Sequence, residues 1–124
     1  MRSPVIFLGI VLLSVATARA QMPPPVVSPE VSADRNLTLR YRAPDAKQVT
    51  VSGELDGKPH PLTKSSDGVW TVTIGPLAPD IYTYVFNVDG ALALDPQNTN
   101  TKLGYGSFGP VSVVQVHHAH LQVD

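Results

Sequence analysis

The chain lacks cysteine and has few charged residues, with nine Lys and Arg and ten Asp and Glu among 124 residues. The absence of cysteine excludes disulfide bonds, thiolate metal sites and a cysteine nucleophile. A formal net charge of −1 excludes a nucleic-acid-binding protein that depends on an excess of positive charge. Charged residues make up 15% and hydrophobic residues 43%, which is the composition of a chain that folds rather than a disordered one. The length allows one domain with a small core.

An apolar run long enough to span a membrane is also missing. The basic Met1-Arg2 is followed by an apolar run from Val5 to Ala16 and then by the small residues Ala18 and Ala20. The run is shorter than the ~20 apolar residues that a membrane span needs. This pattern is typical of a secretory signal peptide over residues 1–20 that is cut after Ala20. We therefore expect a secreted or periplasmic protein with no membrane association after cleavage.

Helical periodicity is absent too, whereas twelve Pro and nine Gly indicate many turns. Apolar and polar residues alternate instead, which predicts half-buried strands. About seven short strands joined by turns predict an all-β, immunoglobulin-like sandwich. The expected strands cover residues 37–42, 49–52, 62–64, 69–74, 81–88, 91–94 and 111–116, with a long surface loop over 95–110.

The expected organisation has four parts. Residues 1–20 are the signal peptide and residues 21–30, with three consecutive prolines, form an extended spacer. The sandwich covers residues 31–116, and residues 117–124 form a tail.

Aromatic residues make up only 6% of the chain, and most fall on the apolar faces of expected strands. We therefore assign Trp70, Tyr82, Tyr84 and Phe86 to the core. The hydroxyl of Tyr82 is expected to bond to the backbone of the turn at 77–80, as in a tyrosine corner. An aromatic ring that stays exposed can stack on a sugar. Trp70, Tyr105 and Phe108 are the candidates for contact with a glycan or a protein partner.

Motifs for catalysis, cofactors or metals are weak. Gly104 to Gly109 matches the dinucleotide pattern G-x-G-x-x-G, but Pro110 and a strand follow where a helix is needed. Ser107 lacks the glycine and the helix of a nucleophile elbow. His117, His118 and His120 form a tail cluster without the further fixed ligands of a zinc site. We expect no catalytic residue, no cofactor and no designed metal site.

A series of motifs nevertheless resembles a known family. The motifs are Gly68-Val69-Trp70, the segment from Leu77 to Gly90, and Leu94-Asp95-Pro96. Together they resemble the early-set immunoglobulin-like domains of the glycogen-binding-module type. They are more similar still to the N-terminal domain of bacterial secreted esterases of the enterochelin- and feruloyl-esterase type. The resemblance extends from Val26 to about Val116 and implies the same sandwich fold.

The sequence departs from this family at the positions that contact sugar. The resemblance implies a Trp near Asp56-Gly57, a Lys at Val85 and a Trp near Ala91-Leu92, and none of these is present. The catalytic Ser, acid and His of the esterases have no counterpart either. The resemblance therefore implies a non-catalytic accessory domain that packs on an α/β-hydrolase domain, as from a truncated or orphan gene. The alternative is a free-standing carbohydrate-binding module for a polysaccharide.

Overall fold

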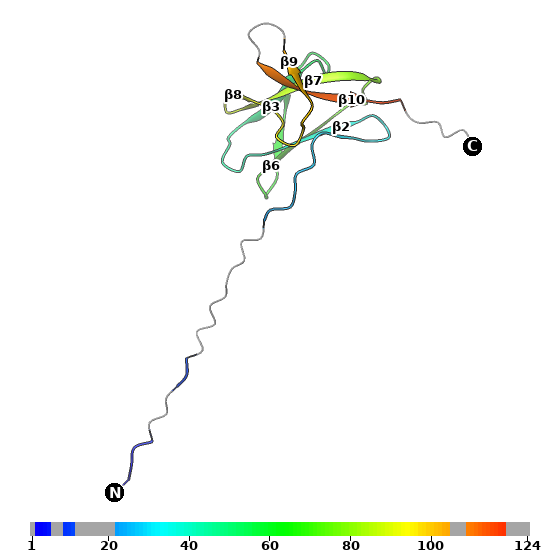
Figure 1. The fold of residues 1–124 in the computed structure, drawn as a ribbon. Coiled ribbons are helices and arrows are strands. Elements are labelled where there is room, and N and C mark those ends of the chain that lie inside the picture. The colour runs from blue at the N-terminus through cyan, green and yellow to red at the C-terminus, as the bar shows by residue number, and fades with distance from the viewer. Residues whose placement is uncertain (1, 6–8, 12–21, 105–108, 119–124) are drawn as a thin grey trace, which may run out of the picture.

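The computed structural model describes residues 2–5, 9–11, 22–104 and 109–118 and confirms an all-β sandwich. One sheet has the strand order β1-β2-β6-β5. The other has the order β4-β3-β7-β10-β9, with β8 paired to β7. In Figure 1, β7, β9 and β10 lie in the upper part of the domain and β2 and β6 lie below them. Among the described residues, no helix is long and apolar enough to cross a membrane.

Ten strands are present where about seven were predicted. The three that the sequence did not predict, β1, β4 and β9, have only two or three residues each, too few for an alternating pattern to be visible. β9 lies within the predicted loop 95–110. The strands are β1 (Glu30–Val31), β2 (Leu37–Arg42), β3 (Val49–Gly53), β4 (His60–Pro61), β5 (Thr63–Lys64), β6 (Val69–Ile74), β7 (Asp80–Val88), β8 (Ala91–Ala93), β9 (Thr101–Leu103) and β10 (Pro110–Val116).

The core lies between the two sheets and is formed by alternate residues of the long strands. Leu37 and Leu39 of β2 and Tyr84 and Phe86 of β7 are fully buried. Trp70 of β6 is 7% exposed, and its Nε1 donates a hydrogen bond to the carbonyl oxygen of Ala43 at 2.8 Å. The assignment of Trp70, Tyr84 and Phe86 to the core is therefore confirmed. Period-two alternation puts these side chains on one face of each strand.

Two predicted turn features are present. The Tyr82 hydroxyl donates to the carbonyl oxygen of Ala78 at 2.7 Å, which is the expected tyrosine corner. Asp89 and Gly90, which have positive φ angles of 49° and 92°, form the two-residue hairpin between β7 and β8. The Asp89 carboxylate also accepts hydrogen bonds from the backbone nitrogens of Lys47 and Gln48. Asp89 therefore holds the β2–β3 connection against the hairpin.

A buried carboxylate, Asp95, holds the centre of the domain together and is 2% exposed. Its Oδ2 accepts from the hydroxyls of Ser28 at 2.6 Å and Tyr84 at 2.7 Å, and its Oδ1 accepts from the backbone nitrogen of Gln97 at 2.9 Å. Its own backbone nitrogen donates to Ser112 Oγ at 3.0 Å. A buried carboxylate is tolerated only when such donors replace its water, so the Asp95 network fixes four separate chain segments.

The segment just before β1 belongs to this network, although the sequence assigned it to a spacer. Ser28 is 5% exposed and accepts a hydrogen bond from the backbone nitrogen of Arg40 at 3.1 Å. Two carbonyl oxygens of the segment, those of Pro24 and Val27, accept from Arg42 and Arg40 at 2.8 Å and 3.0 Å. The segment 22–30 therefore runs along the edge of β2 on which β1 pairs. We refer to it as the N-terminal strap.

Replacing Ser28 tests this anchor. Ser28→Ala removes one donor from the buried Asp95 carboxylate and the acceptor of the Arg40 nitrogen. We expect a loss of about 1–3 kcal/mol in the free energy of unfolding, measured by urea denaturation. Ser66→Ala, at an exposed turn residue, is the control and should change stability by less than ~0.5 kcal/mol. Equal stability of the two variants would show that the strap is not anchored through Ser28.

The Tyr84 hydroxyl gives a prediction for alkaline pH. Burial raises the pKa of Tyr84 well above its usual value, and the neighbouring Asp95 raises it further. The folded state therefore favours the neutral phenol, so this contribution to stability is complete below about pH 10 and is lost as the pH rises beyond it. In an absorbance titration at alkaline pH, the Tyr84 phenol should ionise only together with unfolding. Tyr84→Phe should abolish this part of the absorbance change, which occurs at higher pH than the ionisation of the other tyrosines. A Tyr84 phenol that ionises near pH 10 in the folded protein would contradict the assignment.

Candidate functional site

The outer face of the six-stranded sheet carries the clearest candidate site, a shallow groove between β3 and β9. One depression of about 350 Å³ is continuous with a second of about 250 Å³, because both are lined by Val85, Leu92 and Val111. Ala93, Leu94 and Pro110 extend the second depression. We call this surface the outer groove. Its volume is at the low end for a ligand site, and its floor is aliphatic.

Strand register explains why these residues meet. On β7 the residues Tyr84 and Phe86 point into the core, so Val85 between them points outward. The register pairs Tyr84 with Ser112, which brings Val111 level with Val85 on the neighbouring strand. The Asp89-Gly90 hairpin folds β8 back on β7, and Leu92 then lies opposite Asn87.

Gly53 allows the rim of the groove to form. It ends β3 with a φ of 150°, and a Cβ atom there would lie 2.1 Å from the carbonyl oxygen of Thr83. Only glycine fits this close approach to β7. The chain then continues to Glu54, whose Oε2 accepts a hydrogen bond from the Thr83 hydroxyl at 3.1 Å. Lys102 of β9 lines the opposite side of the same depression, so the aliphatic floor is flanked by one carboxylate and one ammonium group.

The resemblance placed sugar contacts at two positions that the structure brings into this groove. Val85 stands where a Lys would contact sugar, and Leu92 lies where a Trp is implied. Asp56, near the third position, bonds to His60 Nε2 at 2.8 Å and to the Lys58 nitrogen at 3.2 Å. The hydrogen bond from His60 lowers the pKa of the exposed Asp56 carboxyl. The groove lining contains no aromatic ring among the described residues.

The sequence-predicted contact residues do not come together in the described part of the chain. Trp70 has no exposed ring face for stacking, because the ring packs in the core. Tyr105, Phe108 and Ser107 lie outside the described residues. Their flanks, Gly104 and Gly109, are joined by a hydrogen bond at the base of the β9–β10 hairpin, rather than by the strand-to-helix turn of a nucleotide site.

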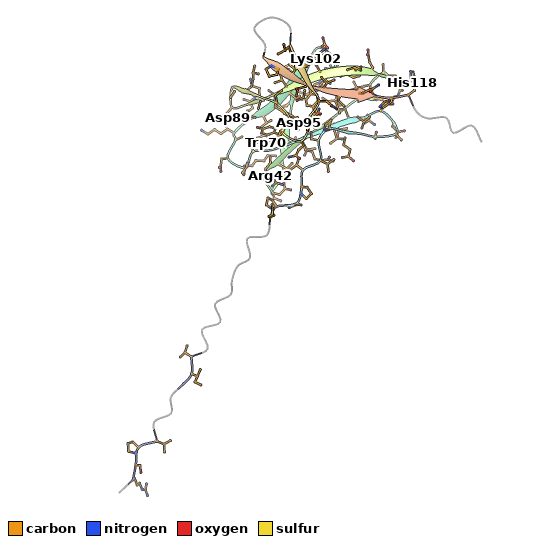
Figure 2. The ribbon with its side chains drawn as sticks, in the orientation of Figure 1. Arg42, Trp70, Asp89, Asp95, Lys102 and His118 are labelled. Carbon is orange, nitrogen blue, oxygen red and sulfur yellow. The ribbon has the colours of Figure 1, made fainter. Side chains whose placement is uncertain are left out.

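Within the described ranges, no group of three metal-binding side chains is found. His117 and His118 are exposed beyond β10, and His120 lies outside the description. Figure 2 shows His118 and Asp89 at opposite ends of the domain, and Lys102 and Arg42 on its opposite sides.

The sequence did not single out Glu54 and Lys102 as neighbours, nor Val85, Leu92 and Val111 as one surface. The signal that could have found them is the set of alternate residues on each strand that point away from the core. On β7 and β10 this set is mixed, with the aliphatic Ile81, Val85, Val111 and Val113 interspersed along the strands with the polar Thr83, Asn87 and Gln115.

The comparisons with known proteins give partial matches. No family model matches the chain. An endo-1,4-beta-xylanase/feruloyl esterase from Xylanibacter ruminicola is 39% identical over 74 residues, which covers 58% of this chain and 10% of that protein. The chain therefore spans about a tenth of the relative's length.

Similar solved structures are enzymes that are much longer than this chain. A candidate alpha amylase from Salmonella typhimurium superposes with a TM-score of 0.56 at 26% identity, covering 71% of this chain and 14% of that one. The glycogen-degrading pneumococcal virulence factor SpuA gives a TM-score of 0.52 at 20% identity, over 64% of this chain and 10% of that one. The likeness to SpuA supports the fold alone.

Proposed function

We propose that the chain is a non-catalytic accessory domain of a secreted esterase-type enzyme and that it packs on an α/β-hydrolase catalytic domain. The observation that carries this proposal is the outer groove. Where the resemblance implies a Lys and a Trp for sugar, the groove has Val85 and Leu92. An aliphatic surface of this kind suits contact with protein better than contact with a hydroxyl-rich sugar.

Two further observations support the proposal. The relative that contains a matching segment is named a xylanase/feruloyl esterase, and nine-tenths of it lies outside the match. The N-terminal pattern ending at Ala20 is that of an exported chain. An accessory domain stabilises or shapes a neighbouring catalytic domain through surface contact and needs no reactive side chain of its own.

An ester hydrolysis assay tests the non-catalytic role. The purified chain should hydrolyse p-nitrophenyl esters no faster than buffer, because a triad with an oxyanion hole is needed for acyl transfer. The control is His60→Ala, since the His60 imidazole is held by the Asp56 carboxylate at 2.8 Å and is the best-placed imidazole for such chemistry. Turnover above buffer that disappears in His60→Ala would refute the proposal and assign catalysis to this pair.

A carbohydrate-binding module is the second candidate, favoured by one observation. The matching proteins include a xylanase and an alpha amylase, both named for action on polysaccharides. A binding module of this fold would need an exposed ring or an amide-rich groove, and the described residues that line the outer groove offer neither.

Affinity electrophoresis separates the two candidates. The chain should migrate equally in plain gels and in gels containing starch, xylan or cellulose, because the groove floor has no ring to stack on a pyranose. A protein known to be retarded by each polysaccharide is run alongside. Retardation of this chain that survives Leu92→Ala but is lost in Tyr105→Ala would favour the binding module and place its contact in the 104–109 loop.

A further inference from the structure

The two outer faces of the sandwich differ in polarity. The outer face of the four-stranded sheet carries Thr38 and Arg40 of β2 and Thr73 of β6, and the N-terminal strap is held by Arg40 and Arg42 at its β2 side. The outer face of the six-stranded sheet carries the polar Thr83, Asn87 and Gln115 together with aliphatic residues. Among the aliphatic residues, Ile81 and Leu92 are 57% and 56% exposed.

We propose that the outer groove is a self-association surface, on which a second copy of this chain packs face to face about a two-fold axis. Such interfaces are isologous, so the surface must be complementary to itself. Aligned packing of two sheets, about 10 Å apart, is a common arrangement for twisted antiparallel sheets. The strand order and register of this sheet provide that complementarity.

Under this two-fold symmetry, the aliphatic residues of the two copies face one another. In the order β3-β7-β10-β9, a two-fold axis along the strands between β7 and β10 places β7 of one copy over β10 of the other. Val85 and Val111 lie at the same level because Tyr84 pairs with Ser112. Val85 of each copy therefore faces Val111 of its partner at the centre of the interface, and the apolar floor is removed from water on both sides.

The same two-fold rotation also brings opposite charges of the two copies together. The axis that places β7 over β10 also places β3 over β9, so Glu54 of each copy approaches Lys102 of its partner. Glu54 lies level with Thr83, to whose carbonyl its nitrogen donates at 3.0 Å, and Lys102 pairs with Val111. Along the strand direction, Glu54 of one copy and Lys102 of its partner are therefore offset by two residues, or about 7 Å. The two long side chains can span this distance. Two reciprocal ion pairs flank the apolar centre.

This inference concerns the same surface as the proposed function but does not depend on it, since a catalytic domain would compete with the second copy for the outer groove. Its test measures the molecular mass of the chain in solution and uses neither turnover nor a catalytic domain. The reciprocity of Glu54 and Lys102 favours a second copy as the occupant in the isolated chain, because a self-complementary charge pair is required only of an isologous interface.

Sedimentation equilibrium from about 1 µM to about 1 mM protein is the experiment. The chain should form a dimer in this range. Leu92→Lys should weaken the dimer at least ~10-fold, because it places a charge in the apolar centre. Thr73→Lys, on the opposite outer face, is the matched control and should leave the association constant unchanged.

Charge reversal gives the sharper test. Glu54→Lys alone and Lys102→Glu alone should each weaken association by ~10-fold or more, because each creates two like-charge contacts. The two single variants mixed in equal amounts, and the double variant Glu54→Lys with Lys102→Glu, should each regain association to within ~3-fold of the original chain.

Three results would overturn the inference. The first is a monomer at every concentration, which would leave the outer groove free for a catalytic domain. The second is a mixture of single variants that associates no better than either variant alone. The third is an equal loss with Thr73→Lys. Circular dichroism and the urea midpoint of each variant show that it is folded, and Lys102→Glu, at an exposed edge strand, keeps the test valid if Glu54→Lys unfolds.

Discussion

The buried Asp95 carboxylate is the interaction on which the arrangement of the domain depends. It accepts hydrogen bonds from Ser28, Tyr84 and the Gln97 nitrogen, which come from the strap, from β7 and from the loop after β8. Asn98 extends the network by donating to the Tyr84 hydroxyl and to the carbonyl oxygen of Val113. A half-satisfied network of this kind would be worse than an apolar core. No buried side-chain polar atom in the described residues is left without a partner.

The Asp95 network also fixes the course of the N-terminal strap. Because Ser28 is fixed at Asp95, the residues before it run along β2, where Arg40 and Arg42 bind the carbonyl oxygens of Val27 and Pro24. Val69 of β6 lies beside this segment and is buried. On the outer face of the larger sheet, by contrast, Ile81 and Leu92 stay exposed.

The sequence predicted much of the fold, because long strands have a strong period-two signal. The strands β2, β6, β7 and β10 begin and end within a residue of their predicted limits, and the Asp89-Gly90 hairpin and the Tyr82 corner are present. Three strands of two or three residues, β1, β4 and β9, were not predicted, because so short a segment shows little alternation, although β5 and β8 of similar length were. The role of Ser28 was hidden for another reason: a serine after a run of prolines gives no local sign of a partner 67 residues away.

The candidate site was less predictable than the fold. Trp70 was a candidate contact because an aromatic ring that stays exposed can stack on a sugar, but the β2–β6 register pairs it with Tyr41 and the indole packs in the core. Glu54, Val85 and Lys102 became neighbours only through the order of β3, β7, β10 and β9, which alternation within single strands does not reveal. Sheet order depends on pairing between segments far apart in the sequence. A surface built across several strands depends on the same pairing.

The composition of the outer groove is the physical basis of both proposals made for this face. Replacing a lysine and an aromatic ring by Val85 and Leu92 would remove the groups that recognise sugar but leave a surface that water solvates poorly. Pairing this face with another apolar surface recovers that free energy, whereas polar edges such as Lys102 and Glu54 keep the surrounding rim soluble. A sheet face with an aliphatic floor and no group placed to bond a hydroxyl among its described residues suits contact with protein better than contact with a sugar.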